Sequence, residues 1–160
     1  MIKLIGIAVL LLTAVGFGFT YSHLLDAEYR RVLGFIKLAK LIRVRIECFS
    51  QPLSEIYGDF SDEALDSCGF TEDLQKSGFI TALCKHKALL GIRGELLSCL
   101  SDFGGELGKS FSDEQVRHCE RYIALLEEKA AEIERELPTR TKMARVLSFS
   151  VAVMMAILLM

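Results

Sequence analysis

Five cysteines and three histidines are the side chains in this 160-residue sequence best suited to chemistry. Two pairs lie close along the chain, Cys84 with His86 and His118 with Cys119, and an imidazole can activate a thiol as a nucleophile. Neighbouring residues of a helix point in different directions, however, and no third orienting group accompanies either pair. We therefore expect no catalytic residues and a protein that is not an enzyme.

The same residues lack the paired spacing of a structural zinc site. The segment from Gly104 to Ser110 resembles a phosphate-binding loop, but it has one residue too few between Gly104 and Gly108, and no strand precedes it. We expect neither a bound metal nor a cofactor. Glycine lets two backbones approach closely, so these glycines indicate a sharp corner or a close helix contact.

The charge composition argues against a nucleic-acid partner. The chain has 19 Lys and Arg against 21 Asp and Glu, a formal net charge of -2, whereas nucleic-acid binding favours a clear basic excess. With 51% hydrophobic residues, only two prolines and no tryptophan, the composition favours helices. The length suits one domain, and we predict an all-α fold.

Both ends of the chain are uncharged and apolar. Leu4 to Tyr21 holds 18 residues without a charge, and Val146 to Met160 holds 15. A helix of the first length is ~27 Å long, enough for a thin bilayer core, whereas the second is short for a span. We predict transmembrane helices at residues 1–21 and 144–160. The alternatives are a cleaved signal peptide, for which no suitable cleavage site follows, and a buried core helix.

Basic residues flank the inner side of both apolar runs, so the positive-inside rule places residues 22–143 in the cytosol and the two termini across the membrane. An odd number of irregularly spaced cysteines fits this reducing location, and we expect reduced, buried thiols. Juxtamembrane basic side chains also contact anionic lipid. The flanking basic residues are Arg30, Arg31, Lys37, Lys40, Arg140, Lys142 and Arg145.

Apolar residues at steps of three and four predict amphipathic helices between the two ends. The first stripe includes Val32, Ile36, Ile42 and Phe49, continues the first apolar run and stops at Ser50-Gln51-Pro52. Thr71 is a candidate cap for the third of these helices. The predicted helices that follow the first stripe are Pro52–Leu65, Glu72–Cys84, Lys87–Leu107 and a long one from Ser112.

The helix from Ser112 has the clearest pattern. Ser112 and Gln115 form a capping box, and an apolar seam follows at the a and d positions of three heptads. Such a seam packs on neighbouring helices of the same bundle more often than it forms an intermolecular coiled coil. Pro138 predicts a kink or short break before the final apolar run. The seam consists of Val116, Cys119, Ile123, Leu126, Ala130, Ile133 and Leu137.

Charge is unevenly distributed before residue 74. Arg30 to Arg45 carries six basic residues and no acidic one, and Glu47 to Asp73 carries eight acidic residues and no basic one. The basic stretch is typical of a helix face bordering anionic lipid. The acidic stretch indicates either a solvated helix face or a dock for a basic partner.

The corner motif Phe103-Gly104-Gly105-Glu106-Leu107-Gly108-Lys109-Ser110, followed by Gln115, resembles the stage III sporulation protein AB family, as does the turn Pro52-Leu53-Ser54-Glu55-Ile56. The resemblance implies a helical bundle similar to the cytoplasmic domain of the type II secretion F component, flanked by N- and C-terminal transmembrane helices. The resemblance also indicates a corner site that is either a partner contact or purely structural. Its residues are Phe103, Gly104, Leu107, Gly108 and Gln115.

The resemblance to that family implies that this chain is a non-enzymatic scaffold. It would belong to the mother cell–forespore transenvelope secretion-like channel needed for endospore formation. The expected location is the cell membrane on the mother-cell side of the engulfed forespore, with the central domain cytoplasmic. The expected partners are other stage III sporulation A-operon proteins, including the secretion-type ATPase, together with membrane lipid and further copies of the chain.

Two rival functions remain at this stage. The first is an inner-membrane platform protein of a type II secretion or type IV pilus system, although those proteins usually carry two copies of the helical domain. The second is a secreted thiol enzyme whose signal peptide has been removed.

Overall fold

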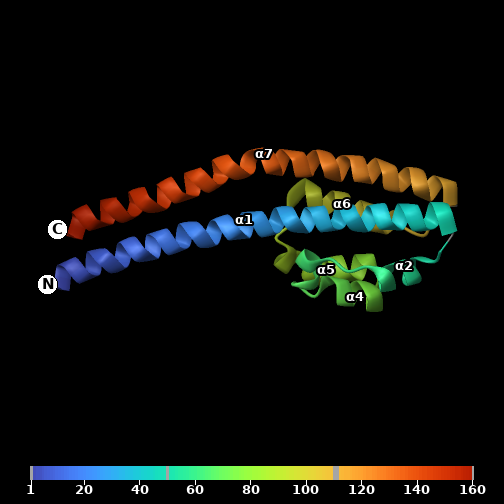
Figure 1. Ribbon diagram of the computed structural model, residues 1–160, viewed down its shortest axis with the longest axis horizontal. Coiled ribbons are helices and arrows are strands. Elements are labelled where there is room, and N and C mark those ends of the chain that lie inside the picture. Colours follow the sequence, from blue (N-terminus) through green and yellow to red (C-terminus); the bar gives the residue numbers. More distant parts are fainter. Residues whose placement is uncertain (1, 50, 110–111, 160) are drawn as a thin grey trace. The chain divides into compact units, whose positions relative to one another are not determined.

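The computed structural model describes residues 2–49, 51–109 and 112–159. These residues form helices joined by short turns, with no strand among them, so the all-α prediction is confirmed (Figure 1). The helices are α1 (Ile2–Phe49), α2 (Leu53–Asp59), α3 (Glu63–Asp66), α4 (Phe70–Ser77), α5 (Phe79–Leu90), α6 (Gly94–Glu106) and α7 (Ser112–Leu159).

The chain divides into two compact units. The central unit is Glu28–Glu132, and the terminal unit combines Met1–Ala27 with Ile133–Met160. Within the described part of the chain, no helix combines the length and the apolar character needed to cross a bilayer. The flanking transmembrane helices predicted at residues 1–21 and 144–160 are therefore not supported by the helices described here.

One face of α1 forms a wall of the core in the central unit. Val32, Ile36 and Ile42 of the predicted stripe are buried, because steps of three and four place them on one side of the helix. The prediction is wrong for Phe49, which is 64% exposed at the last residue of α1. The helix runs without a break from the apolar end and stops before Pro52, as predicted.

Aromatic rings from five helices connect the centre of this core. Ring centroids lie 5.0 Å apart for Phe35 and Phe70, 5.9 Å for Phe70 and Phe79, and 5.6 Å for Phe79 and Phe103, all edge-to-face. Phe103 also meets Tyr122 at 5.6 Å. Edge-to-face pairs contribute about 0.5–1.5 kcal/mol beyond their buried area, so this column ties α1, α4, α5, α6 and α7 together.

Three predicted helices are shorter than expected because glycine or extended residues interrupt them. Phe60 has an extended backbone and Asp62 caps α3 through the amide of Ala64, so Pro52–Leu65 splits into α2 and α3. Gly78 separates α4 from α5, and Gly91 ends α5, with φ of 80° and 71°. Backbones with such positive φ values favour glycine. The predicted helix Glu72–Cys84 is therefore divided at Gly78, and the predicted helix Lys87–Leu107 is divided at Gly91.

Helix α4 begins at Phe70 with Gly69 at its N-cap, so the cap predicted at Thr71 is wrong. The short helices pack in series, α2 and α3 against α4, α4 against α5 and α5 against α6. Figure 1 shows α2, α4 and α5 grouped together.

Pro138 was predicted to cause a kink or a short break. Helix α7 is continuous through Pro138, so the break is absent. Its apolar seam is buried within the same chain at Cys119, Ile123, Leu126 and Ala130. This burial confirms that the seam packs in the bundle of its own chain.

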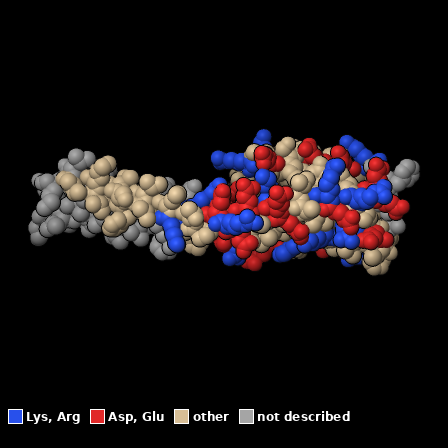
Figure 2. All heavy atoms as spheres, turned by 90° about the horizontal axis from the view of Figure 1, so that it is seen from above, with Lys and Arg blue, Asp and Glu red and all other residues tan. Residues whose placement is uncertain are grey.

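The basic and acidic stretches of the sequence pair with each other. Lys37 Nζ lies 2.7 Å from the buried carboxylate of Asp62, and Arg45 Nη2 lies 3.2 Å from Asp59. These residues therefore have partners within the chain, and the lipid-bordering face and the partner dock stay predictions. Figure 2 shows the two signs of charge interspersed over the face of the central unit that it presents.

Close approach at Gly34 makes the Asp62 pairing possible. A Cβ built on Gly34 would lie 2.8 Å from Asp62 Oδ1 and 3.0 Å from Leu65 Cγ. Any larger residue there would push α3 away from α1.

The five cysteines are free thiols, but only Cys119 is buried. Cys48 and Cys84 are exposed, so the prediction of buried thiols is wrong for these two. Burial raises the pKa of the Cys119 thiol from 9.0 to about 11 and that of Tyr57 from 10.0 to about 12.

We expect Cys48 and Cys84 to react with a thiol reagent at once, and Cys119 only after unfolding, because the buried neutral thiol is a poor nucleophile. The folded state holds the Cys119 proton more tightly than the unfolded state does. Stability should therefore fall as pH rises from 9 to 11. Labelling kinetics and urea titrations across this pH range measure both effects. Immediate labelling of Cys119 in the folded chain would contradict its burial.

Candidate functional site

The predicted corner lies between α6 and α7, within the central unit. The amide of Leu107 donates to the carbonyl of Phe103 at 3.2 Å and ends α6. Gly108 then adopts a φ of 79°, which turns the chain away from the helix axis. Residues 110 and 111 of the connection lie outside the described part of the chain, and α7 begins at Ser112.

Helix α6 passes close to α5 at Gly104. A Cβ on Gly104 would lie far inside van der Waals contact of the Phe79 ring and 2.8 Å from Ile80 Cδ1. A Cβ on Gly108 would lie 3.3 Å from Leu53 Cδ1 of α2. The sequence prediction of close packing at the corner glycines is confirmed at Gly104.

The remaining corner residues divide between the core and the surface. Phe103 is only 1% exposed, and Gln115 is also buried. Leu107 is half-buried and Gly108 is exposed. The structure thus brings the predicted corner residues into one region, where Phe103, Gly104 and Gln115 contribute to packing.

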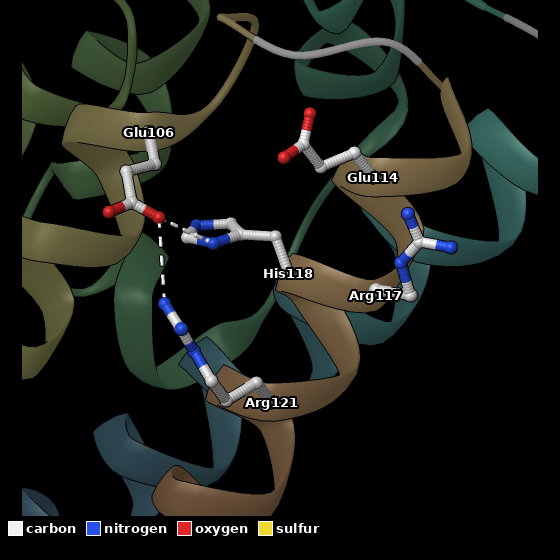
Figure 3. Close-up of a pocket in the computed structure, with 5 residues that line it drawn as sticks. All are labelled: Glu106, Glu114, Arg117, His118 and Arg121. Carbon is white, nitrogen blue, oxygen red and sulfur yellow. Dashed lines mark ion pairs between the residues drawn. The ribbon is translucent and has the colours of Figure 1, made fainter.

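A polar pocket of about 370 Å³ opens beside this corner. Glu106 reaches it from the end of α6, and four residues reach it from the first turns of α7 (Figure 3). The four are Glu114, Arg117, His118 and Arg121.

The His118 side chain is only 10% exposed. Its Nδ1 lies 2.6 Å from a carboxylate oxygen of Glu106, and its Nε2 lies 3.5 Å from the carbonyl oxygen of Phe103. Both neighbours can accept a hydrogen bond from the ring. The ring also stacks on Phe103, with centroids 5.9 Å apart and planes 9° apart.

Arg121 extends the same network. Its Nη2 lies 3.6 Å from Glu106, and its guanidinium carbon lies 5.0 Å from the centroid of the Tyr122 ring. Glu114 and Arg117 form no ion pair with any residue that the structure describes. The pocket therefore contains three ion-paired residues, Glu106, His118 and Arg121. Its other two residues, Glu114 and Arg117, are available to bind a charged partner.

Most of the basic residues predicted to flank a membrane have partners in the protein itself. The Arg31 guanidinium donates to the carbonyl of Leu90 at 3.0 Å. Lys37 pairs with Asp62 as described above, and Lys40 Nζ lies 2.6 Å from Glu127 of α7.

The other basic residues differ in their surroundings. Arg30 and Lys142 are exposed. Arg140 pairs with Glu136 at 2.5 Å, one turn earlier on α7. The side chain of Arg145 lies outside the described residues.

A second ion-paired cluster lies between α4 and α5. Asp73 lies 2.7 Å from Lys85 Nζ and 2.5 Å from His86 Nε2, and these two contacts lower the pKa of the Asp73 carboxyl. His86 is buried there, and Cys84 is exposed on the same helix. Across the described ranges, no group of three or more His, Cys, Asp or Glu is placed to hold a metal.

Sequence reasoning missed the polar pocket. His118 was considered for thiol chemistry with Cys119 and for zinc binding. Its spacing from Glu114 and Arg121, four and three residues away, places all three on one face of a helix. This spacing is the feature of the sequence that could have identified the α7 side of the pocket. Glu106 could not be added from the sequence, because its position depends on the corner.

We expect Gly108→Val to lower the free energy of unfolding by about 1–3 kcal/mol, because a β-branched residue is strained at positive φ. Gly58→Val serves as a control for a glycine with a Cβ in open space, since nothing lies within 4 Å of it. Thermal unfolding followed by circular dichroism measures both. Equal midpoints for Gly108→Val and the unaltered chain would remove the argument for this glycine.

No curated protein and no solved structure matches the sequence. The family model for stage III sporulation protein AB matches residues 3–160. Because this match covers nearly the whole chain, including the corner and both ends, the chain belongs to the stage III sporulation protein AB family and is a sporulation-related protein.

Proposed function

We propose that this chain is a non-enzymatic membrane scaffold of the mother cell–forespore transenvelope secretion-like channel, required for endospore formation. The observation that carries the proposal is the family match over residues 3–160. The proposed location is the cell membrane on the mother-cell side of the engulfed forespore, with the central unit in the cytoplasm.

Membrane anchoring through both ends is part of this proposal. The support from the sequence is the uncharged run from Leu4 to Tyr21 and the apolar run from Val146 to Met160. Large apolar side chains near the end of α7 are exposed, although folded proteins usually bury such side chains. Among them are Leu147, Phe149 and Met154. An extended apolar surface of this kind is stable when lipid or protein covers it. We propose that lipid covers it.

The proposed work of the central unit is to hold partners in place. The support is a rigid helical core whose surface carries charges of both signs, together with the corner pocket, where Glu114 and Arg117 lack ion-pair partners among the described residues. The proposed partners are other stage III sporulation A-operon proteins, including the secretion-type ATPase, and further copies of this chain.

Deletion of the gene in its sporulating host tests the proposed function. We expect engulfment to finish and heat-resistant spores to be lost, and the unaltered gene supplied in trans to restore them. Normal spore counts after deletion would contradict the proposal.

Cysteine variants in the same complementation assay test for catalysis. We expect Cys84→Ala to restore spores fully, because its exposed thiol has no role in a scaffold. Complete loss of spores with Cys84→Ala, while the protein still accumulates and folds, would favour the thiol-enzyme function.

A further inference from the structure

We propose that the corner pocket binds the guanidinium group of an arginine from a partner protein, between the carboxylates of Glu106 and Glu114. This assignment rests on the partner-holding role proposed above, and it adds the chemistry of the partner group. The whole site lies in the central unit, because every residue that lines the pocket falls within Glu28–Glu132.

Carboxylate oxygens without a partner among the described residues line the pocket. Glu106 uses one oxygen, Oε2, which lies 2.6 Å from His118 Nδ1 and 3.6 Å from Arg121 Nη2. Its Oε1 and both carboxylate oxygens of Glu114 form no ion pair or hydrogen bond with any residue that the structure describes. An ionised carboxylate only accepts hydrogen bonds, so these oxygens can bind a donor.

The two carboxylates belong to different helices and meet across one ring. Glu106 reaches the pocket from the end of α6, and Glu114 reaches it from the first turn of α7. Figure 3 shows their carboxylates on different sides of the His118 ring, which is 10% exposed and stacks on Phe103. A volume of about 370 Å³ is near the small end of the range for ligand sites, so the pocket suits one polar side chain.

The two arginines of the pocket are placed less favourably for an acidic ligand. Arg121 is already engaged, because its guanidinium lies 3.6 Å from Glu106 Oε2 and 5.0 Å from the centroid of the Tyr122 ring. The Arg117 guanidinium lies on the far side of the His118 ring from Glu106 (Figure 3). An anion between the helices would meet two carboxylates, and like charges repel at such a contact.

Asp102 adds negative charge on the α6 side of the pocket. It lies one turn before Glu106, is exposed, and forms no ion pair with any residue in the described ranges. Burial raises the pKa of the Tyr122 hydroxyl, and the charges of Glu106 and Asp102 raise it further, while Arg121 acts in the opposite direction. Asp102 therefore lies close enough to act on a ring whose centroid is 4.6 Å from that of His118.

A guanidinium group fits this arrangement better than an ammonium group. It is planar and carries its N–H donors in a fixed fork, so one group can donate to carboxylates on two sides at once. The ammonium group of lysine is a compact charge that donates from a single point. The separated carboxylates of Glu106 and Glu114 therefore favour arginine.

An NMR titration of the full-length, detergent-solubilised chain tests the contact. The chain has three histidines, and ¹³C-labelled histidine reports each imidazole separately. The probe is N-acetyl-arginine amide. N-acetyl-citrulline amide has the same shape without the charge, and N-acetyl-glutamate amide carries the opposite charge. We expect the arginine probe alone to shift the His118 signals saturably, while the signals of His23 and His86 stay unchanged.

Glu114→Gln and Asp113→Asn form a matched pair for this titration. Both remove one negative charge from the first turn of α7, so they weaken the interaction with the helix dipole in the same way, but only Glu114 lines the pocket. We expect Glu114→Gln to raise the Kd of the arginine probe about tenfold, the usual loss for a hydrogen bond to a charged group. Asp113→Asn should leave it unchanged. Circular dichroism checks that both variants retain their helices.

Four results of the titration would overturn the site. Equal shifts with the arginine and citrulline probes would remove the requirement for charge. Saturable binding of the glutamate probe that Arg117→Gln abolishes would assign the pocket to an acidic group. The other two results are no shift with any probe and an equal Kd for Glu114→Gln and Asp113→Asn. All four leave the proposed scaffold function in place.

Complementation of the deleted gene links the pocket to a partner. We expect Glu114→Arg to lower the count of heat-resistant spores while the protein still accumulates, because a second guanidinium is repelled from the pocket. Asp113→Arg should restore normal counts. Normal spores with Glu114→Arg, or an equal loss with Asp113→Arg, would overturn the assignment to a partner. Normal spores after deletion of the gene would instead contradict the proposed function, whatever the probes bind.

Discussion

Replacing Gly104 with alanine should lower the free energy of unfolding by at least about 1 kcal/mol, even though alanine favours a helix over glycine by a similar amount. The added Cβ would enter the space of the Phe79 ring and lie 2.8 Å from Ile80 Cδ1. Phe79 belongs to the aromatic column and contacts Phe35, Phe70 and Phe103, so it cannot move without disturbing other rings.

Gly105→Ala is a matched control for this prediction. Gly105 lies in the same helix, and nothing lies within 4 Å of a Cβ placed there. Alanine should therefore stabilise the protein by about 0.5–1 kcal/mol through helix propensity. Urea unfolding of the two detergent-solubilised chains measures the effects, which should have opposite signs. Stabilisation by both substitutions would show that α6 does not pack closely on α5.

Truncation of Phe103 should have the largest effect of any single substitution at the corner. Phe103→Ala should lower the free energy of unfolding by about 3–5 kcal/mol, the usual range for a buried phenylalanine. The ring is 1% exposed and contacts Phe79, His118 and Tyr122, so its removal leaves a cavity between α5, α6 and α7.

Phe49→Ala is the corresponding control, because the Phe49 side chain is 64% exposed at the end of α1. A surface change of this kind should alter stability by less than about 0.5 kcal/mol. Thermal and urea unfolding of both variants give the comparison. Similar losses for Phe103→Ala and Phe49→Ala would contradict the placement of Phe103 in the core.

The sequence predicted the long helices better than the short ones. The apolar stripe of α1 and the seam of α7 repeat over many turns, so their period identifies both the helix and its buried face. The segment between Pro52 and Leu107 was predicted as three helices and contains five. Gly78 lies inside the predicted helix Glu72–Cys84, but its backbone, with a φ of 80°, ends one helix and begins another.

Tertiary contacts explain the other differences. Asp62 lies in a predicted helix, yet it leaves the helical path because its carboxylate caps α3 and pairs with Lys37. No local pattern indicates that Gly34, on another helix, makes room for this carboxylate. The pairing of the basic and acidic stretches was missed for the same reason, since it joins residues that only the fold brings together.

The corner site was predicted in part. The motif identified Phe103, Gly104 and Gln115, and the structure places them in one packed region. It did not identify the polar pocket, whose Glu106 and His118 meet only because α6 and α7 turn back on each other. Glycines mark a corner in a sequence, whereas the charged groups that the corner brings together depend on its angle.

The proposed scaffold function is tested most directly by purifying the tagged full-length chain from detergent-solubilised membranes of sporulating cells and identifying its stoichiometric partners by mass spectrometry. A tagged strain that forms normal spores provides the starting material. We predict that the chain is recovered from the membrane fraction with other stage III sporulation A-operon proteins, including the ATPase. Recovery of the chain alone, or from the soluble fraction without detergent, would contradict it.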